Sequence, residues 1–352
     1  MYDIVLAFVT SFVLSYLAIP AIISISRKKR LFDQPNHRTS HAVGIPIFGG
    51  LAIFAAMLVS IILWTPFKFF ADLQYILGAV LLLFLMGAKD DIDPVSPIIK
   101  FAAQICSAGI LVFMANIRIT TLYSIFGVGE LPFWISVLLS IFVIVALINA
   151  FNLIDGINGL AGSISVLSSL VFGYWFYIIG KTELAIVAVA LVGSVIAFLR
   201  YNYSPAKIFM GDAGSLLLGI VASILAIQFI ELNKLMTDSP LYIPSAPAMA
   251  IAILIIPIFD TARVMIIRLL KGKSPFKADK LHVHHLMVEL GLSHMQTTWI
   301  LLFVNLLFIG IAFRFRHLGN LDLFFLMMGI AVFLSLVLQF GVKFVQAKKV
   351  TE

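Results

Sequence analysis

The feature that most constrains this chain is a succession of apolar runs, each about as long as a membrane helix, with only short polar breaks between them. A membrane helix needs about 20 mostly apolar residues. Charged residues make up only 12% of the chain, against about 25% in a soluble domain. We therefore predict one all-α domain over residues 1–352, a polytopic membrane helical bundle with about 11 transmembrane helices. The predicted spans lie near 4–26, 45–64, 74–89, 97–116, 133–150, 160–179, 184–199, 213–231, 247–270, 296–313 and 322–342.

The basic residues predict how this bundle is oriented. With these spans, the loops and tail that follow odd-numbered spans carry 18 of the 24 Lys and Arg residues, and the other loops carry 6. The positive-inside rule then favours an N-out, C-in topology. The basic run 27–30 follows the first span without a small-residue cleavage site, so we expect a retained first helix. The net charge of +7 is spread over several loops, which argues against a nucleic-acid partner.

Polar groups interrupt the apolar pattern at the ends of several spans. In the predicted topology they all fall on the cytoplasmic side of the membrane. A charged cluster at the end of a membrane helix is costly unless it serves a cation, a proton or a substrate. The sequence therefore predicts a cytoplasmic-face active site. Its candidate residues are Asp90, Asp91, Asp155, Asp212 and, beside Asp279, the histidines His282, His284 and His285.

Asp90 and Asp91 stand next to each other after the third span, and Lys100 begins the next span. Repulsion between adjacent carboxylates raises one pKa unless a cation lies nearby, so the pair can bind Mg²⁺ or act as a base. Lys100 can neutralise a phosphate. A solvated helix end is the competing interpretation of an Asp-Asp pair.

The segment 149–162 combines amides, an acid and glycines. Asn149, Asn152 and Asp155 are spaced three apart, so a helix places them on one face, and Asn158 follows. The glycines let the backbone turn and a ligand approach closely. Such side chains suit a nucleobase, a ribose, or Mg²⁺ with its phosphates. A glycine turn with a purely structural role is the alternative.

Phe209, Gly211, Asp212 and Gly214 open the eighth span. A helix N-terminus favours anions, and an acid there can hold a divalent metal against a diphosphate. Asp212 alone also fits an N-cap. That simpler interpretation does not account for the aromatic residue and the two glycines together.

The basic segment 271–285 ends in three histidines and suits a diphosphate or a sugar. Zinc is the competing ligand, but the segment has no companion cysteine. Its spacing also differs from the two-His, four-apart pattern of zinc hydrolases. In a further polar loop on the same side, Arg38 can make a bidentate phosphate contact.

Taken in order, these segments resemble the polyprenyl-phosphate N-acetylhexosamine-1-phosphate transferase superfamily, glycosyltransferase family 4. The resemblance covers roughly residues 30–290. The run 271–276 before His282 is similar to the branch that acts on UDP-N-acetylhexosamine. The resemblance implies transfer of N-acetylhexosamine 1-phosphate, chiefly GlcNAc 1-phosphate, from a UDP-sugar to undecaprenyl phosphate, with release of UMP.

The same resemblance implies the setting of the reaction. The cofactor is Mg²⁺, with Mn²⁺ as a substitute, and the location is the cytoplasmic (inner) membrane of a bacterium. The product starts lipid-linked cell-envelope glycans, such as O-antigen of lipopolysaccharide or teichoic acid. A homodimer is compatible with the resemblance.

Roles in the chemistry are implied by motif position. Asp90 matches a base on the lipid phosphate, and Asp91 matches its partner near metal and substrate. Asp212 matches the principal Mg²⁺ ligand, with Asn152 beside the metal and the diphosphate. Lys100 aligns loosely, because the spacing after the Asp pair varies in the superfamily.

Roles in substrate binding are also implied by position. Phe209 matches the residue that stacks on uracil, and Asp155 and Asn158 match the pair that contacts the nucleoside. The histidines His282, His284 and His285 match residues that bind the diphosphate and the sugar. Many bacterial members carry a second Asp where this chain has Asn158, so a role that needs charge there does not carry over.

Two mechanisms and two other functions stay open at this stage. The lipid phosphate can attack the β-phosphorus directly, or an Asp can form a covalent phospho-enzyme first. The alternative enzyme is the peptidoglycan translocase, which takes UDP-muramoyl-pentapeptide. An ion-coupled transporter predicts acids near mid-bilayer, where only Asp260 falls, with Arg263 and Arg268 near it.

Overall fold

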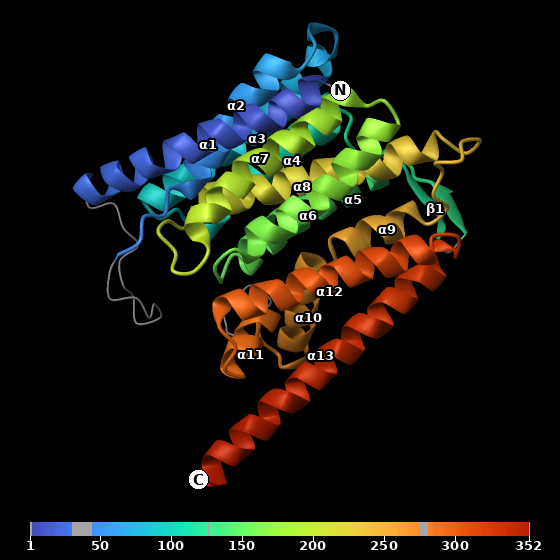
Figure 1. Ribbon diagram of the computed structural model, residues 1–352. Coiled ribbons are helices and arrows are strands. Elements are labelled where there is room, and N and C mark those ends of the chain that lie inside the picture. Colours follow the sequence, from blue (N-terminus) through green and yellow to red (C-terminus); the bar gives the residue numbers. More distant parts are fainter. Residues whose placement is uncertain (1, 30–43, 126, 275–280, 352) are drawn as a thin grey trace.

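The computed structural model describes residues 2–29, 44–125, 127–274 and 281–351, and in these ranges the chain is a helical bundle with one short β-hairpin (Figure 1). The elements are α1 (Tyr2–Lys29), α2 (Gly49–Trp64), η1 (Phe67–Phe69), α3 (Phe70–Ile92), α4 (Pro97–Gly109), η2 (Ile110–Met114), β1 (Thr121–Ile125), β2 (Val128–Glu130), α5 (Phe133–Ile154), α6 (Leu160–Ile178), α7 (Thr182–Asn202), α8 (Gly211–Lys234), α9 (Ala246–Ile253), α10 (Ile255–Leu270), α11 (Val283–Glu289), α12 (His294–Arg314) and α13 (Asn320–Thr351).

Each of the eleven predicted apolar runs lies on a helix or on the bent pair α9–α10, which confirms a polytopic helical membrane protein. Among the described residues, eight helices are long and apolar enough to cross a membrane, or nine if the bent pair is one span. α2 is shorter, with 16 residues. The count of eleven crossings and the N-out, C-in orientation stay predictions.

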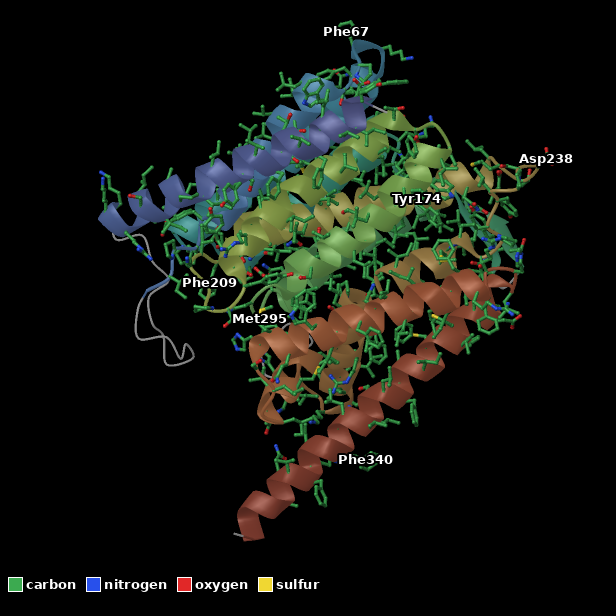
Figure 2. The ribbon with its side chains drawn as sticks, in the orientation of Figure 1. Phe67, Tyr174, Phe209, Asp238, Met295 and Phe340 are labelled. Atoms are coloured by element: carbon green, nitrogen blue, oxygen red, sulfur yellow. The ribbon has the colours of Figure 1, made fainter. Side chains whose placement is uncertain are left out.

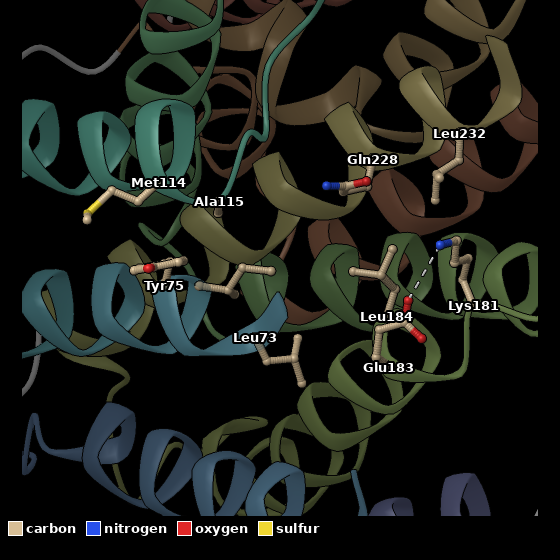
Figure 3. A pocket seen from close by; sticks show the side chains of 10 residues that line it. Leu73, Tyr75, Met114, Ala115, Lys181, Glu183, Leu184, Gln228 and Leu232 are labelled. Carbon is tan, nitrogen blue, oxygen red and sulfur yellow. Dashed lines mark ion pairs between the residues drawn. The ribbon is translucent and has the colours of Figure 1, made fainter. Parts of the chain in front are cut away.

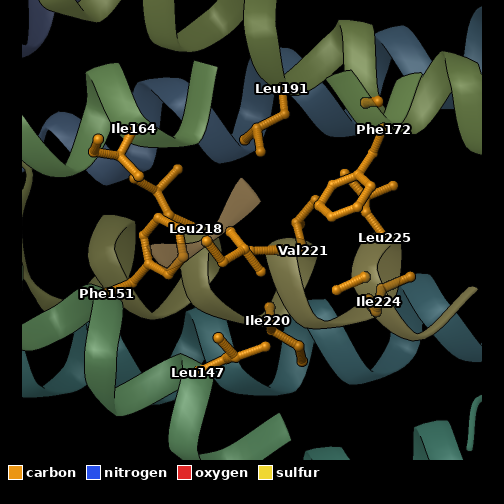
Figure 4. Close-up of a cluster of buried hydrophobic side chains, with 14 of the residues drawn as sticks. Leu147, Phe151, Ile164, Phe172, Leu191, Leu218, Ile220, Val221, Ile224 and Leu225 are labelled. Carbon is orange, nitrogen blue, oxygen red and sulfur yellow. The ribbon is translucent and has the colours of Figure 1, made fainter. Parts of the chain in front are cut away.

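Helix α8 forms the centre of the bundle and packs against α3, α5 and α6. Leu218, Val221 and Leu225 on α8 pack among buried aromatic and aliphatic side chains of neighbouring helices (Figure 4). Membrane helices associate through close packing and small residues, because lipid is as apolar as their side chains. Gly219 shows this, since a Cβ there would lie 2.5 Å from Cα of Ile148 on α5.

Hydroxyl groups tie the first helices to the bundle. Ser60 on α2 donates to the carbonyl of Ala7 on α1 at 2.6 Å, and Ser15 on α1 donates to the carbonyl of Ser194 on α7 at 3.0 Å. All four residues are buried. Small serine side chains therefore let α1, α2 and α7 approach closely, and each hydroxyl finds its acceptor on the neighbouring backbone.

The apolar run 247–270, predicted as one span, is divided in the structure into α9 and α10, which meet at 84°. Pro257 has no N–H to donate to the carbonyl of Ile253, four residues earlier. Asn305 of α12 donates to that carbonyl at 3.1 Å instead. The bend therefore follows from the proline, which lacks the N–H that a straight helix needs here. The buried side-chain amide of Asn305 stabilises the bend.

The two ends of the bundle carry different features. Phe209 and Met295 lie at one end, and Phe67 and Asp238 lie towards the other (Figure 2). The hairpin β1–β2 is antiparallel, with Thr121 opposite Glu130. The all-α prediction did not include this small sheet, which is too short for a period of two to be recognised.

Candidate active site

Three polar segments predicted from the sequence meet where α3 and α5 end and α8 begins. Lys100 on α4 donates to Asp90 at 3.1 Å and also pairs with Asp212. Asn152, in the last turn of α5, donates to Asp212 at 2.7 Å. We call Asp90, Lys100, Asn152 and Asp212 the carboxylate–lysine cluster. The structure thus brings together residues that are more than a hundred positions apart in the sequence.

The adjacent acids Asp90 and Asp91 have different partners. Asp90 accepts from the backbone N–H of Val95 at 2.7 Å and faces Lys100. Asp91 accepts from the backbone N–H groups of Asp212 and Ala213, at 2.6 and 3.0 Å. Because the first N–H groups of a helix have no partner within it, Asp91 caps α8 from a neighbouring helix. Asp90 is the acid of this pair that shares the lysine.

Residue 211 has to be glycine for this contact to form. Gly211 has φ of +72°, in the left-handed region that favours glycine. A Cβ there would lie 2.5 Å from Oδ2 of Asp91 and would also overlap the carbonyl oxygen of Ile47. The glycines flanking Asp212 therefore have a packing role, which the sequence pattern alone did not separate from a ligand-binding one.

Asn152 orients the carboxylate of Asp212. Its Nδ2 donates both to Oδ1 of Asp212 and to the hydroxyl of Ser215, at 2.7 and 2.8 Å. Asn149, one turn earlier, instead makes a reciprocal amide pair with Gln104 of α4, at 2.7 and 3.3 Å. Of the two amides, Asn152 contacts the cluster, and Asn149 joins α4 to α5.

Asp155 directly follows α5 and is half-buried, with no hydrogen bond to any described residue. Burial raises its pKa well above the ordinary value, and the nearby carboxylates of Asp212 and Asp91 raise it further. A carboxyl group held this way accepts a hydrogen-bond donor or a cation readily. Asp155 is therefore available to a ligand that approaches the cluster.

Asn158 is buried, with 6% of its surface exposed, and its carbonyl accepts from the hydroxyl of Thr298 on α12 at 2.9 Å. The sequence pattern missed Asn202, which supports this loop. Asn202 is buried, accepts from the N–H of Gly159 at 2.7 Å and donates to the carbonyl of Ile208 at 2.9 Å. One amide thus joins the loop after α5 to the loop before α8. A polar residue at the end of an apolar run was the available signal.

The three histidines cluster beside the same loop. The ring centroids of His284 and His285 are 4.2 Å apart, and those of His282 and His284 are 5.7 Å apart. A Cβ at Gly156 would lie 2.5 Å from Nε2 of His284, so this ring packs directly on the glycine. Burial lowers the pKa of His284 to about 3, and the neighbouring His285 contributes. His284 is therefore neutral near pH 7.

Asp260 on α10 is a site residue that the sequence did not assign. It is 3% exposed, its Oδ2 lies 2.8 Å from Nδ1 of His282, and its Oδ1 accepts from the N–H of Val283 at 2.8 Å. Arg263 lies one turn along, 3.9 Å from Asp260, and donates to the carbonyl of Leu281 at 2.8 Å. This carboxylate–imidazole pair fixes the orientation of His282. Its position as the one acid well inside a predicted span, away from the span ends, was the available signal.

Phe209 lies in a segment that pairs with the residues before α2. Its N–H donates to the carbonyl of Pro46 at 2.7 Å, and its carbonyl accepts from the N–H of Gly49 at 2.9 Å. This pairing fixes the backbone at Phe209 close to Asp212. Arg38 and Asp279, both singled out in the sequence, lie outside the described residues.

The oxygen atoms at this end of the bundle fit a hard divalent cation. Asp90 and Asp212 already share one positive charge, the ammonium of Lys100. Mg²⁺ prefers carboxylate and amide oxygens and is usually completed by water and phosphate oxygens. Within the described residues, no three His, Cys, Asp or Glu side chains are grouped to hold a metal. A metal at Asp212 and Asn152 would therefore share its coordination with a substrate.

Comparison with known proteins gives consistent matches. Residues 73–230 match the family model "Glycosyl transferase family 4". A protein of Bacillus subtilis (strain 168), "Probable undecaprenyl-phosphate N-acetylglucosaminyl 1-phosphate transferase", is 33% identical over 313 residues, 88% of this chain and 84% of the relative. Relatives named "Undecaprenyl-phosphate alpha-N-acetylglucosaminyl 1-phosphate transferase" include those of Escherichia coli (strain K12), 32% identical over 77% of this chain and 73% of the relative, and of Yersinia pestis, 31% identical over 83% and 78%.

Proposed function

Because the chain belongs to glycosyl transferase family 4, we propose that it transfers N-acetylglucosamine 1-phosphate from UDP-N-acetylglucosamine to undecaprenyl phosphate and releases UMP. The relatives' names support the sugar and the lipid acceptor. The observation that carries the proposal is the carboxylate–lysine cluster at one end of a membrane bundle. A lipid acceptor places its phosphate at such an end while its chain stays among the helices. The proposed location is a bacterial inner membrane, where the product starts cell-envelope glycans.

In the proposed reaction, an oxygen of the lipid phosphate attacks the β-phosphorus of the UDP-sugar. The new P–O bond joins lipid and sugar phosphate, and the bond from the β-phosphorus to the bridging oxygen breaks, so UMP leaves with that oxygen. Asp90 takes up or orients the proton of the lipid phosphate. Lys100 lies between Asp90 and Asp212 and offsets negative charge as the phosphates approach.

We propose Mg²⁺ as the cofactor, with Mn²⁺ as a substitute. Asp212 and Asn152 would hold it, because the side-chain amide of Asn152 lies against the Asp212 carboxylate at the start of α8. When bound, the metal supplies positive charge against the diphosphate. Asp91 supports the site by capping α8.

The remaining residues are proposed to bind the donor. Phe209 offers an aromatic face to uracil, and Asp155 has acceptor oxygens without a hydrogen bond among the described residues. His282, oriented by Asp260, would contact the diphosphate or sugar together with His284 and His285.

The first test is UMP release by purified protein with Mg²⁺, undecaprenyl phosphate and one UDP-sugar at a time. We expect release with UDP-N-acetylglucosamine that requires both the lipid and the metal, and that EDTA abolishes. Release only with UDP-N-acetylgalactosamine would change the sugar. Release only with UDP-muramoyl-pentapeptide would identify the peptidoglycan translocase. No release with any donor from folded protein would contradict the proposal.

Two variants test the roles within the site. Asp212→Asn should abolish UMP release, while Asp322→Asn at the start of α13 should not. Phe209→Ala should raise the KM for the UDP-sugar by about fivefold or more, because stacking a base on an aromatic ring contributes ~1–3 kcal/mol. Phe67→Ala, at the other end of the bundle, is its control. Full activity of Asp212→Asn, or an unchanged KM for Phe209→Ala, would remove the corresponding assignment.

A further inference from the structure

Figure 3 shows a cavity of about 230 Å³ and the side chains that line it. It lies at the end of the bundle opposite the carboxylate–lysine cluster. It is formed where α3 and α7 begin and where η2 and α8 end. Its lining includes Tyr75, Ala115, Lys181, Glu183 and Gln228. None of the residues assigned above to the candidate active site lines it.

Glu183 gives this cavity its chemical character. The side chain of Glu183 is 8% exposed, and its Oε1 lies 3.9 Å from Nζ of Lys181, at the outer limit of an ion pair. Its Oε2 is buried and has no hydrogen-bond partner among the described residues. Removing a carboxylate from water without a partner is costly. Glu183 lines the cavity, so the cavity is suited to a ligand that brings a positive charge beside this carboxylate.

The acceptors available in the cavity fit an ammonium group better than a metal. Gln228 of α8 faces the cavity from across Glu183 (Figure 3). One carboxylate and one amide are few ligands for Ca²⁺, which takes about six to eight oxygens. An ammonium group needs only about three acceptors, and the Glu183 carboxylate and the Gln228 carbonyl can supply them.

The cavity lies at the ends of membrane helices, which indicates that the ammonium group belongs to a lipid headgroup. The ends of membrane helices lie at the level of the lipid headgroups. Lys181 is half-exposed there and supplies a positive charge beside the buried carboxylate. A headgroup with an ammonium next to a phosphate matches this order of charges, and Tyr75 is an aromatic residue of the type enriched at the membrane interface.

We propose that this cavity binds the headgroup of phosphatidylethanolamine, with the ammonium on Glu183 and Gln228 and the phosphate beside Lys181. The site is separate from the proposed active site, since it lies at the other end of α3 and α8. It lets the protein select one lipid of the surrounding membrane.

The test uses the full-length protein in nanodiscs that contain equal amounts of phosphatidylethanolamine and phosphatidylglycerol. Native mass spectrometry counts the lipids that stay bound after mild release. We expect the wild type to retain one phosphatidylethanolamine at least fivefold more often than phosphatidylglycerol. Glu183→Gln should lose this preference. Glu130→Gln, which changes an exposed acid at the same end, should keep it.

A second variant keeps the test decisive if Glu183→Gln does not fold. Ala115→Leu fills the cavity and leaves the carboxylate in place, so it should also lose the preference. If either variant folds and still retains phosphatidylethanolamine as often as the wild type does, the proposal is overturned. Binding of soluble phosphoethanolamine to Glu183 in discs without phosphatidylethanolamine would overturn the lipid assignment.

Discussion

At the residue scale, neighbouring acids in this protein have separate tasks. Asp90 shares Lys100 with Asp212, whereas both oxygens of Asp91 accept backbone N–H groups of α8. The Asp-Asp pattern predicted a polar site but could not divide these tasks, because the division depends on α8 lying beside α3. The same holds for Asn149 and Asn152, whose partners come from two different helices.

Replacing Asp260 tests whether the orientation of His282 matters. In Asp260→Asn, the new side-chain oxygen can still accept from the N–H of Val283. The side-chain NH2 group then faces Nδ1 of His282. The imidazole then has to carry its proton on Nε2, so we expect UMP release to fall roughly tenfold or more. Nitrogen NMR of the histidine tautomer provides a readout that simple destabilisation would not give. Asp238→Asn, in a remote loop, is the control. Normal turnover in a variant with the changed tautomer would contradict this role.

His284 makes stability depend on pH. Its pKa in the folded protein is lowered by burial to about 3, from an ordinary value of about 6.5, so the unfolded chain binds a proton first as the pH falls. Its contribution is complete above about pH 6.5 and is lost between about pH 6.5 and pH 3. We expect the free energy of unfolding to fall by about 2 kcal/mol between pH 6.5 and pH 5 from this group.

Chemical unfolding in detergent at the two pH values measures this loss. His284→Gln should reduce the difference between pH 6.5 and pH 5, while His317→Gln, which changes an exposed histidine, should leave it as in the wild type. An equal loss in wild type and His284→Gln would show that His284 is not the group responsible.

At the element scale, the site depends on how closely α2, α3 and α8 approach. The N–H groups of Gly49 and Gly50 donate to the carbonyls of Phe209 and Met210, at 2.9 and 2.8 Å. These contacts place the start of α2 against the start of α8. The sequence predicted both helices from their apolar runs, but the pairing between their first turns is a tertiary contact with no local pattern.

Gly50→Ala tests this close approach. A Cβ at Gly50 would overlap the backbone of Gly214, which cannot move aside as a flexible side chain can. We expect a lower melting temperature and a loss of UMP release, since overpacking typically costs about 1–3 kcal/mol. Gly78→Ala on α3 is a matched control, because nothing lies within 4 Å of its Cβ position. A melting temperature equal to that of Gly78→Ala would contradict the close contact.

At the scale of the whole molecule, all the candidate residues described by the structure lie at one end of the bundle, and the membrane orientation decides which compartment that end faces. Asp93 follows α3 near the carboxylate–lysine cluster, and His317 follows α12 at the opposite end. Both are exposed. Placing single cysteines at these positions therefore tests the N-out, C-in prediction.

The labelling experiment starts from Cys106→Ala, since Cys106 is the only cysteine of the chain. In intact cells, a membrane-impermeant maleimide should label the cysteine of His317→Cys. It should label the cysteine of Asp93→Cys only after the cells are permeabilised. The reverse pattern would mean that the candidate active site faces outward and cannot receive a cytoplasmic UDP-sugar.

Much of the architecture was predictable because membrane helices leave a strong signal. Apolar length placed all eleven runs, and Pro257 was a visible sign of the bend between α9 and α10. The clustering of Asp90, Asp155 and Asp212 at one end followed from alternation of the spans. Contacts that depend on tertiary packing, such as Asp260 with His282, could not be read from spacing.

The fastening of α8 at both ends has a mechanical consequence. Asp91 holds its first turn, while Thr120 donates to Glu231 near its last turn, at 2.7 and 2.6 Å. Its 24 residues span about 36 Å, slightly more than the ~30 Å hydrocarbon layer. In bilayers of different thickness, the peripheral helices α1 and α13 can tilt. Helix α8 then keeps its tilt, so that the carboxylates of the candidate site stay at a constant depth relative to the membrane surface.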